Sequence, residues 1–369
     1  MSNNNKVDII NNEDREHINS NNFQLLKNVN ITEMYHKSSS NNNYNCLDYK
    51  FLIFNSVDDI LYLVYPGDYK KNSIVIYDIN DNKNRITIKY ENYKEITNFR
   101  HYLDNIEKID YVLASSSKNI VILNINDCSI VTKIDSQYGE EVCSACFINY
   151  NNNINIISSS GEWKGYSGIF NETIRGYDLK GKELNHYDSE NVTYCIDSFH
   201  DKNKNKYFII IGCEGYIKSY EYENKVKERT LRKYNCNKTY NYLYKSIIYD
   251  KNGKVKLIEP STIGEIRIWD FYSSSILNKI KICSKFGMAS ICLWNSNNLF
   301  IACRDKTVKI LNLNDFNNIE SINHFINAVT IIQKVIHPKD GEFLVTQETQ
   351  GKFRKSSLEI NLWKFINKH

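Results

Sequence analysis

The sequence contains little proline and no long hydrophobic run. Only three of its 369 residues are Pro, and no apolar stretch reaches the roughly 18 residues that a membrane-spanning helix needs. The segment from Met1 to Ser20 is polar and rich in Asn, so it lacks the apolar core of a signal peptide. We therefore expect an intracellular protein with no transmembrane segment, and we favour the cytoplasm over the nucleus.

A strong charge of one sign is also missing. Lys and Arg number 47 and Asp and Glu number 43, which gives a formal net charge of +4. So small an excess over this length excludes a protein-wide positive surface for nucleic acid or membranes. A polyanionic partner would need a local basic patch.

Patterns for metal sites and disulfides are absent too. Cys143 and Cys146 form the one C-x-x-C pair among ten cysteines, and no second pair follows at the spacing of a zinc site. The stretch from Asp78 to Asn82 alternates oxygen-bearing side chains, but Lys83 stands where a calcium loop needs Gly. We expect no metal, no cofactor and, because no export signal is present, reduced thiols.

Catalytic motifs are missing as well. The chain has no Walker A loop, no H-E-x-x-H and no G-x-S-x-G, and Gly165 to Gly168 is one residue short of the last of these. Its eight His are far apart and fall largely near the turns between expected strands. These observations favour a binding protein over an enzyme.

The sequence is rich in aromatic residues, and many of them belong to a repeated strand pattern. Tyr and Phe number 27 and 16, which is typical of sheet proteins. An alternating strand that ends in an aromatic residue or Leu occurs seven times, at residues 73–79, 119–125, 173–179, 216–222, 265–271, 307–313 and 358–364. The anchor residues of these strands lie 42 to 54 residues apart, at Tyr77, Leu123, Tyr177, Tyr220, Trp269, Leu311 and Trp363. This period fits units of four short strands.

Some of these segments resemble a known family. Ile266 to Asp270 reads Ile-Arg-Ile-Trp-Asp, and Arg304 to Ile310 reads like the hairpin that precedes such a strand. From about residue 22 onward the chain resembles the WD-repeat proteins, which implies an all-β, seven-bladed β-propeller with four-stranded antiparallel blades. The resemblance assigns structural repeat positions to Trp269, Asp270, Asp305, Thr307, His324 and Trp363. No blade keeps the family's full set of hydrogen-bonding residues, so we expect apolar packing between blades to hold the ring together.

The two ends of the chain complete one blade in this interpretation. The last unit stops after its third strand, and an N-terminal strand at about residues 22–31 can supply the fourth and close the ring. The expected organisation is a disordered Asn-rich leader at 1–21 and a single propeller at 22–369. Its blades are expected at about 44–91, 96–135, 140–188, 191–232, 243–282, 287–322 and 326–369.

Such a ring predicts a non-catalytic scaffold that binds other proteins within a multiprotein complex. By the family pattern, the residue before the hairpin Asp projects onto the narrower face of the ring. This predicts partner-binding roles for Arg304 and its equivalents Ser116, Cys213 and Thr262. Trp163 and Tyr166, in a long hairpin, add the aromatic side chains typical of binding hot spots, although local packing of Trp163 is an equal alternative.

A basic stretch supports an alternative function. It contains Lys225, Lys227, Arg229, Arg232, Lys233 and Lys238, with tyrosines interleaved. Such a mixture can contact phosphates and stack on bases, so the alternative is a propeller that binds nucleic acid or a phosphoinositide lipid through blade 4. The same residues also suit a charged outer strand that resists pairing with other chains. No motif identifies the partner.

Overall fold

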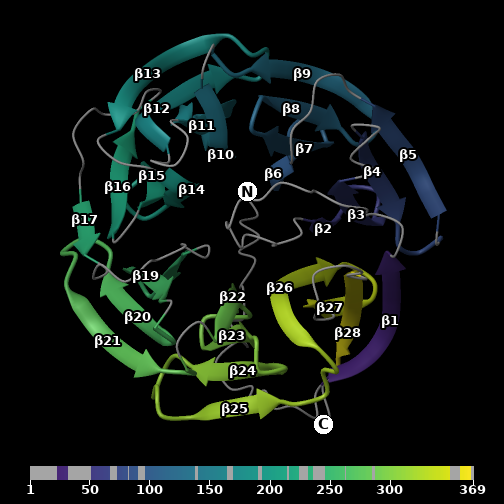
Figure 1. Cartoon of the computed structure of the whole chain (residues 1–369), viewed down its shortest axis with the longest axis vertical. Coiled ribbons are helices and arrows are strands. Elements are labelled where there is room, and N and C mark those ends of the chain that lie inside the picture. Colours follow the sequence, from purple (N-terminus) through teal and green to yellow (C-terminus); the bar gives the residue numbers. More distant parts are fainter. Residues whose placement is uncertain are drawn as a thin grey trace, which may run out of the picture.

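The computed structural model is a ring of seven four-stranded antiparallel sheets (Figure 1). It describes residues 23–31, 51–66, 73–81, 83–89, 96–137, 140–163, 169–189, 193–213, 216–223, 232–235, 246–261, 263–284, 287–349 and 358–366. Every regular element in this part of the chain is a strand. The prediction of an all-β, seven-bladed propeller is therefore confirmed. The expected leader lies outside the described residues.

The blades follow one another along the chain, and in each blade the first strand lies nearest the centre of the ring (Figure 1). Blade 1 contains β2 (Leu52–Asn55), β3 (Leu61–Pro66), β4 (Ser73–Asp78) and β5 (Lys83–Lys89). Blade 2 contains β6 (Ile96–Asp104), β7 (Ile109–Ser116), β8 (Asn119–Asn124) and β9 (Ser129–Asp135). Blade 3 contains β10 (Glu140–Tyr150), β11 (Asn153–Trp163), β12 (Ile169–Asp178) and β13 (Glu183–Ser189). Blade 4 contains β14 (Thr193–Asp201), β15 (Lys206–Cys213), β16 (Tyr216–Tyr222) and β17 (Arg232–Asn235). Blade 5 contains β18 (Ile247–Lys251), β19 (Lys254–Pro260), β20 (Glu265–Asp270) and β21 (Ile276–Lys281). Blade 6 contains β22 (Met288–Leu293), β23 (Asn298–Cys303), β24 (Thr307–Asn312) and β25 (Ile319–Ile322).

Blade 7 is built from both ends of the chain. It contains β26 (Ala328–His337), β27 (Gly341–Thr349), β28 (Leu358–Phe365) and, as its outer strand, β1 (Phe23–Ile31). Strand β1 runs antiparallel to β28 from the pair Phe23–Phe365 to the pair Ile31–Leu358, with a bulge at Leu26. The two strands lie side by side in Figure 1, which confirms the predicted closure of the ring by an N-terminal strand.

Apolar packing between blades forms the core. Seven clusters of buried residues occur, and each joins one blade to the next around the ring. The cluster between blades 7 and 1, for example, combines Val345 and Leu362 with Ile53 and Leu63. Removing such surface from water contributes roughly 25 cal/mol per Å². The expected apolar packing is thus present at all seven junctions, and the dependence of cohesion on it stays a prediction.

The polar residue after the anchor has a local structural role in five blades. Asp270 Oδ1 accepts hydrogen bonds from the backbone N–H groups of Tyr272 and Ser273, at 3.0 and 2.7 Å. Asp78 does the same for Asn80 and Asp81. A short side chain that bonds to the backbone two residues on closes a tight turn, so this position of the repeat fixes the turn between the third and fourth strands.

Antiparallel pairing places the connections of each blade on two faces. Turns between first and second strands, and between third and fourth strands, lie on one face, here called the 1–2 face. Turns between second and third strands, and the links from blade to blade, lie on the opposite 2–3 face.

Candidate functional site

Arg304 lies on an exposed turn of the 2–3 face, between β23 and β24. Its backbone N–H donates to the carbonyl of Gly287 on the link into blade 6, at 2.7 Å. Within the turn, the Thr307 hydroxyl donates to Asp305 Oδ1 at 2.6 Å, and Lys306 adopts a left-handed conformation with φ of 67°. The backbone is thus fixed on both sides of a side chain that extends into solvent.

The other residues predicted for this rim are placed differently. Ser116 and Cys213 are fully buried, because each is the last residue of a second strand and points into the blade packing. The prediction that they contact a partner was wrong for these two side chains. Trp163 is the last residue of β11 and pairs with Ile169, which gives its backbone position only. Thr262 and Tyr166 lie outside the described residues.

Two residues of the basic stretch are described, and both make aromatic contacts. Arg232 Nε donates to the carbonyl of Tyr272 in blade 5 at 2.6 Å, and its guanidinium carbon lies 4.9 Å from the centre of the Tyr272 ring. Arg232 therefore joins blades 4 and 5. Lys233 is exposed, with Nζ 4.0 Å from the centre of the Tyr216 ring. Lys225, Lys227, Arg229 and Lys238 lie outside the described residues.

Tyr272 also contacts blade 4 through a carboxylate. Its hydroxyl donates a short hydrogen bond to Asp201, and Lys204 Nζ lies 3.2 Å from the centre of its ring. Burial and the bond to Asp201 raise the pKa of Tyr272. Burial acts to raise the pKa of Asp201 as well, but bonds from Tyr272 and from two backbone N–H groups outweigh it and lower that pKa. The group is a junction between two blades.

The structural repeat positions occupy distinct roles. Trp363 Nε1 donates to the Thr346 hydroxyl on the neighbouring strand at 2.9 Å, and Trp269 Nε1 donates to Glu259 Oε2 at 3.2 Å. Each tryptophan thus ties the third strand of its blade to the second. His324 is exposed on the link between blades 6 and 7, and its structural role stays a prediction.

A set of basic residues at one third-strand position, most of them buried, was not predicted from the sequence. The third-strand position two residues before the anchor is Val in blades 1 and 2, Asn in blade 7 and basic in blades 3 to 6, where Arg175, Lys218, Arg267 and Lys309 occupy it. All except Lys309, which is half-buried, are at most 5% exposed. The alternation of apolar and basic letters was visible in the sequence, but it is equally typical of a strand with one solvated face.

These polar side chains hold the links between blades. Arg175 Nη2 lies 2.8 Å from Glu140 Oε1 at the start of β10, where the chain enters blade 3, and Lys309 Nζ donates to the carbonyl of Ile282 at 2.9 Å on the link into blade 6. In blade 7 the equivalent Asn361 donates to Glu348, whose other oxygen accepts from the backbone of the incoming link. Paired and buried in this way, the charges serve the architecture.

A pair of thiols lies beside the Arg304 turn. Cys303 ends β23, and Cys283 lies on the link into blade 6, packed against the same apolar cluster. A hydrogen bond from the Cys303 thiol, aided by the charges of Lys309 and Lys281, lowers the pKa of Cys283 despite partial burial. The same bond and burial raise the pKa of Cys303. Cys283 is therefore the more nucleophilic thiol of the pair.

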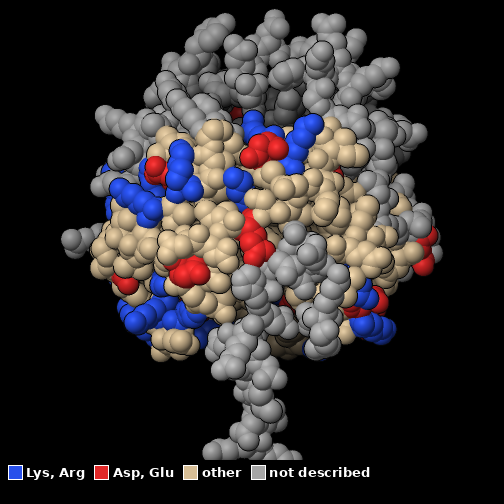
Figure 2. Space-filling model, turned by 90° about the horizontal axis from the view of Figure 1, so that it is seen from below, with Lys and Arg blue, Asp and Glu red and all other residues tan. Residues whose placement is uncertain are grey.

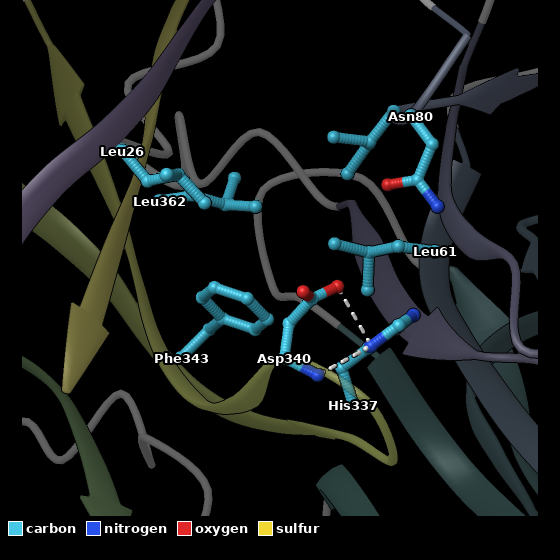
Figure 3. A pocket seen from close by; sticks show the side chains of 8 residues that line it. Leu26, Leu61, Asn80, His337, Asp340, Phe343 and Leu362 are labelled. Carbon is cyan, nitrogen blue, oxygen red and sulfur yellow. Dashed lines mark hydrogen bonds and ion pairs between the residues drawn. The ribbon is translucent and has the colours of Figure 1, made fainter.

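A cavity of about 270 Å³ lies on the 1–2 face, at the seam between blades 7 and 1 (Figure 3). Leu26, Phe343 and Leu362 form its blade 7 wall, and Leu61, Ile79 and Asn80 line it from blade 1. His337 and Asp340 lie together at one side, joined by an ion pair with Nδ1 and Oδ2 2.9 Å apart. His337 Nε2 also lies 3.1 Å from the carbonyl of Asp59 in blade 1. The lining of the cavity is thus mixed, with apolar side chains and the polar residues Asn80, His337 and Asp340.

The surface charge is mixed. On the side of the ring seen in Figure 2, the coloured acidic and basic side chains are interspersed, and neither sign forms a continuous field. Among the residues that the structure describes, no group of three or more His, Cys, Asp or Glu side chains is arranged to hold a metal ion. No described helix is long and apolar enough to cross a membrane.

Comparison of the sequence with models of protein families finds no match, and a search of curated proteins finds no similar sequence.

Proposed function

We propose that the protein is a divergent WD-repeat propeller that acts as a non-enzymatic scaffold and binds other proteins through its 2–3 face. The observation that carries the proposal is the Arg304 turn, where an exposed guanidinium is presented from a backbone fixed at Gly287, Asp305 and Thr307. A turn whose backbone is already fixed loses little backbone freedom on binding, and Arg is enriched at the centres of interfaces.

The internal charges support the same conclusion. Arg175, Arg267 and Lys309 are engaged in holding strands and links, where a catalytic centre would instead need convergent groups open to a substrate. A ring stiffened by such pairs suits the presentation of surface loops to partners.

We further propose a cytoplasmic location. The neighbouring residues Cys283 and Cys303 are both thiols. Two thiols so near each other would be oxidised readily in a secretory compartment. They persist in a compartment where glutathione and thioredoxin keep thiols reduced.

The test is affinity purification of the tagged protein from its native cells, with and without nuclease, followed by mass spectrometry. Wild type is compared with the double variant Arg304→Ala and Trp163→Ala, and Lys339→Ala serves as the control because it removes an exposed cation from the 1–2 face. A protein set that survives nuclease, is lost in the double variant and is kept in the control supports the proposal. Recovery of nucleic acid or lipid that none of these variants changes would reject it and favour the alternative through blade 4.

A further inference from the structure

Two corresponding positions of blades 3 and 6 bind different groups. Ser160 and Cys303 correspond, since each pairs with the first-strand residue just before the bulge. The third-strand cations Arg175 and Lys309 correspond as well, because each follows by two residues the partner of that position. In blade 3 the Ser160 hydroxyl and the Arg175 guanidinium donate to the two oxygens of Glu140, at 2.7 and 2.8 Å. These two positions are therefore suited to hold a negative charge.

In blade 6 they lie beside the thiol of Cys283. Cys283 is on the link between β21 and β22, and its thiol is hydrogen-bonded to that of Cys303. Lys309 Nζ donates to the carbonyl of the residue before Cys283, at 2.9 Å. The bond from Cys303 and the charge of Lys309 lower the pKa of the Cys283 thiol. Lys281 adds to this effect, while burial and Asp305 oppose it. The Cys283 thiolate is thus stabilised by the same two positions that hold a carboxylate in blade 3.

The two thiols differ in exposure. Cys303 is fully buried at the end of β23, where it pairs with Met288 and Thr307 on the neighbouring strands. Cys283 is half-buried and lies outside the strands, so a small oxidant can reach its sulfur directly. An accessible thiolate next to a second thiol is the arrangement of a redox-sensitive cysteine and its resolving partner.

We propose that Cys283 is a site of oxidation by hydroperoxides and that Cys303 converts the product into an intramolecular disulfide. The Cys283 thiolate attacks one oxygen of hydrogen peroxide, so an S–O bond forms and the O–O bond breaks. The departing hydroxide takes up a proton and leaves as water. The sulfur is thereby oxidised to sulfenic acid, and the peroxide is reduced.

This first oxidation also activates Cys303. The hydrogen bond to Cys283, burial and the negative charge of Cys283 all raise the pKa of the Cys303 thiol. In the sulfenic acid form Cys283 carries no charge, so the last of these causes disappears and Cys303 loses its proton more readily. The Cys303 sulfur then attacks the Cys283 sulfur. An S–S bond forms, the S–O bond breaks, and the hydroxide leaves as water with the proton from Cys303.

The movement that this step needs comes from the link into blade 6. A disulfide brings its sulfurs to about 2.05 Å, closer than two hydrogen-bonded thiols. Cys303 is held between two strands, whereas the backbone N–H of Cys283 donates to the carbonyl of Gly264 at a longer 3.2 Å. The same link contains Gly287, whose carbonyl accepts the N–H of Arg304. The disulfide therefore forms beside the Arg304 turn, but its chemistry does not depend on what that turn binds.

The experiment treats the reduced full-length protein with hydrogen peroxide and maps its cysteines by mass spectrometry after digestion with trypsin. The digest places Cys283 in peptide 282–285 and both Cys292 and Cys303 in peptide 286–304. We expect a cross-link between these two peptides that dithiothreitol reverses. Cys292→Ser should keep the cross-link. Cys303→Ser, which gives blade 6 the residue of blade 3, should abolish it and leave a sulfenic acid at Cys283 that dimedone traps.

Variants of Lys309 test the stabilising charge. Lys309→Met should slow the oxidation of Cys283, and Lys309→Arg should restore it, with Cys292 in the same digest as the reference. Oxidation of Cys283 no faster than that of Cys292 would overturn the inference, as would equal rates in Lys309→Met and wild type. A cross-link that Cys292→Ser removes, or sulfinic acid at Cys283 without a cross-link, would also overturn it. If Lys309→Met fails to fold, the maps of wild type and Cys292→Ser decide the matter.

Discussion

The closure of the ring can be tested at one side chain, Phe23. The Phe23 ring lies 5.4 Å from Trp294 and 5.6 Å from Phe300, both in blade 6, and 5.4 Å from Phe365 on β28 (ring centres). Phe23→Ala removes all three contacts at the end of β1 where the chain enters the sheet. The variant therefore weakens the junction between blades 6 and 7 and the attachment of the closing strand together.

The expected effect follows from these contacts. Truncation of a fully buried Phe costs about 3–5 kcal/mol, and each aromatic pair contributes about 0.5–1.5 kcal/mol beyond its buried area. Because Phe23 is only partly buried, we expect Phe23→Ala to lower the free energy of unfolding by about 2–3 kcal/mol. Leu25→Ala, on the same strand but 47% exposed, should lower it by no more than about 1 kcal/mol.

Urea unfolding followed by circular dichroism measures both variants. Hydrogen exchange followed by mass spectrometry adds a local measurement, because a loosened β1 should expose the backbone of β28 (Leu358–Phe365) before that of blade 3. If Phe23→Ala costs no more than Leu25→Ala, or if exchange rises equally in all blades, the assignment of β1 as the closing strand is refuted.

Three further predictions concern buried polar groups. Glu259→Ala should lower the free energy of unfolding, measured in urea, by about 3–5 kcal/mol. The change leaves the buried Arg267, whose Nη1 lies 3.5 Å from Glu259 Oε1, without its fully buried counter-ion. Tyr272→Phe should raise the pKa of Asp201. The stability that comes from this lowered pKa is fully present above pH about 3.9, the ordinary pKa of Asp. It is lost as the pH falls through the lower pKa that Asp201 has in the folded protein. The loss in melting temperature for Tyr272→Phe should thus be largest near neutral pH and shrink in acid. Cys283 should react with iodoacetamide faster than the other described thiols, and Cys303→Ala should slow it, as read by mass spectrometry.

Each of these predictions has a control. The carboxylate of Glu265 also lies near Arg267, at 3.8 Å, but it is 27% exposed, so Glu265→Ala should lower the free energy of unfolding much less than Glu259→Ala. Equal losses in the two variants would contradict the role given to burial of the Arg267–Glu259 pair. A loss for Tyr272→Phe that is independent of pH would contradict the role of its bond to Asp201. Cys292 is also partly buried, and equal alkylation of Cys292 and Cys283 would contradict the effect of the neighbouring charges.

The fold was predictable because its signal is repeated. The third strand of each blade alternates apolar residues, ends in an anchor such as Tyr77 or Trp269 and usually has a turn-capping residue next to it, so seven weak copies reinforce one another. The closing strand was predictable for a different reason. A blade that lacks its fourth strand leaves an exposed edge, and only one unassigned strand-like segment was available to cover it.

The candidate sites were less predictable, because they depend on packing between blades. Ser116 and Cys213 were predicted as equivalents of Arg304, but each ends its second strand, as the buried Cys303 does, and therefore lies inside its blade. In the sequence, Arg175, Lys218 and Arg267 look like the solvent-exposed side of an alternating strand. Only the structure shows that they are buried. The seam cavity lies between side chains of blades 7 and 1, so it depends on how these two blades meet in space.

The pairing of β1 with β28 also sets the order in which the protein can be completed during synthesis. Roughly 330 residues separate Ile31 from Leu358. At a ribosomal rate of roughly 5–20 residues per second, β1 waits on the order of 15–65 s for its partner. During that interval the nascent chain carries an unpaired strand with Leu25 and Leu26 on it, while the strands of blades 1 to 6 are being made. The pairing that seals the ring can thus form only after β28 has been made.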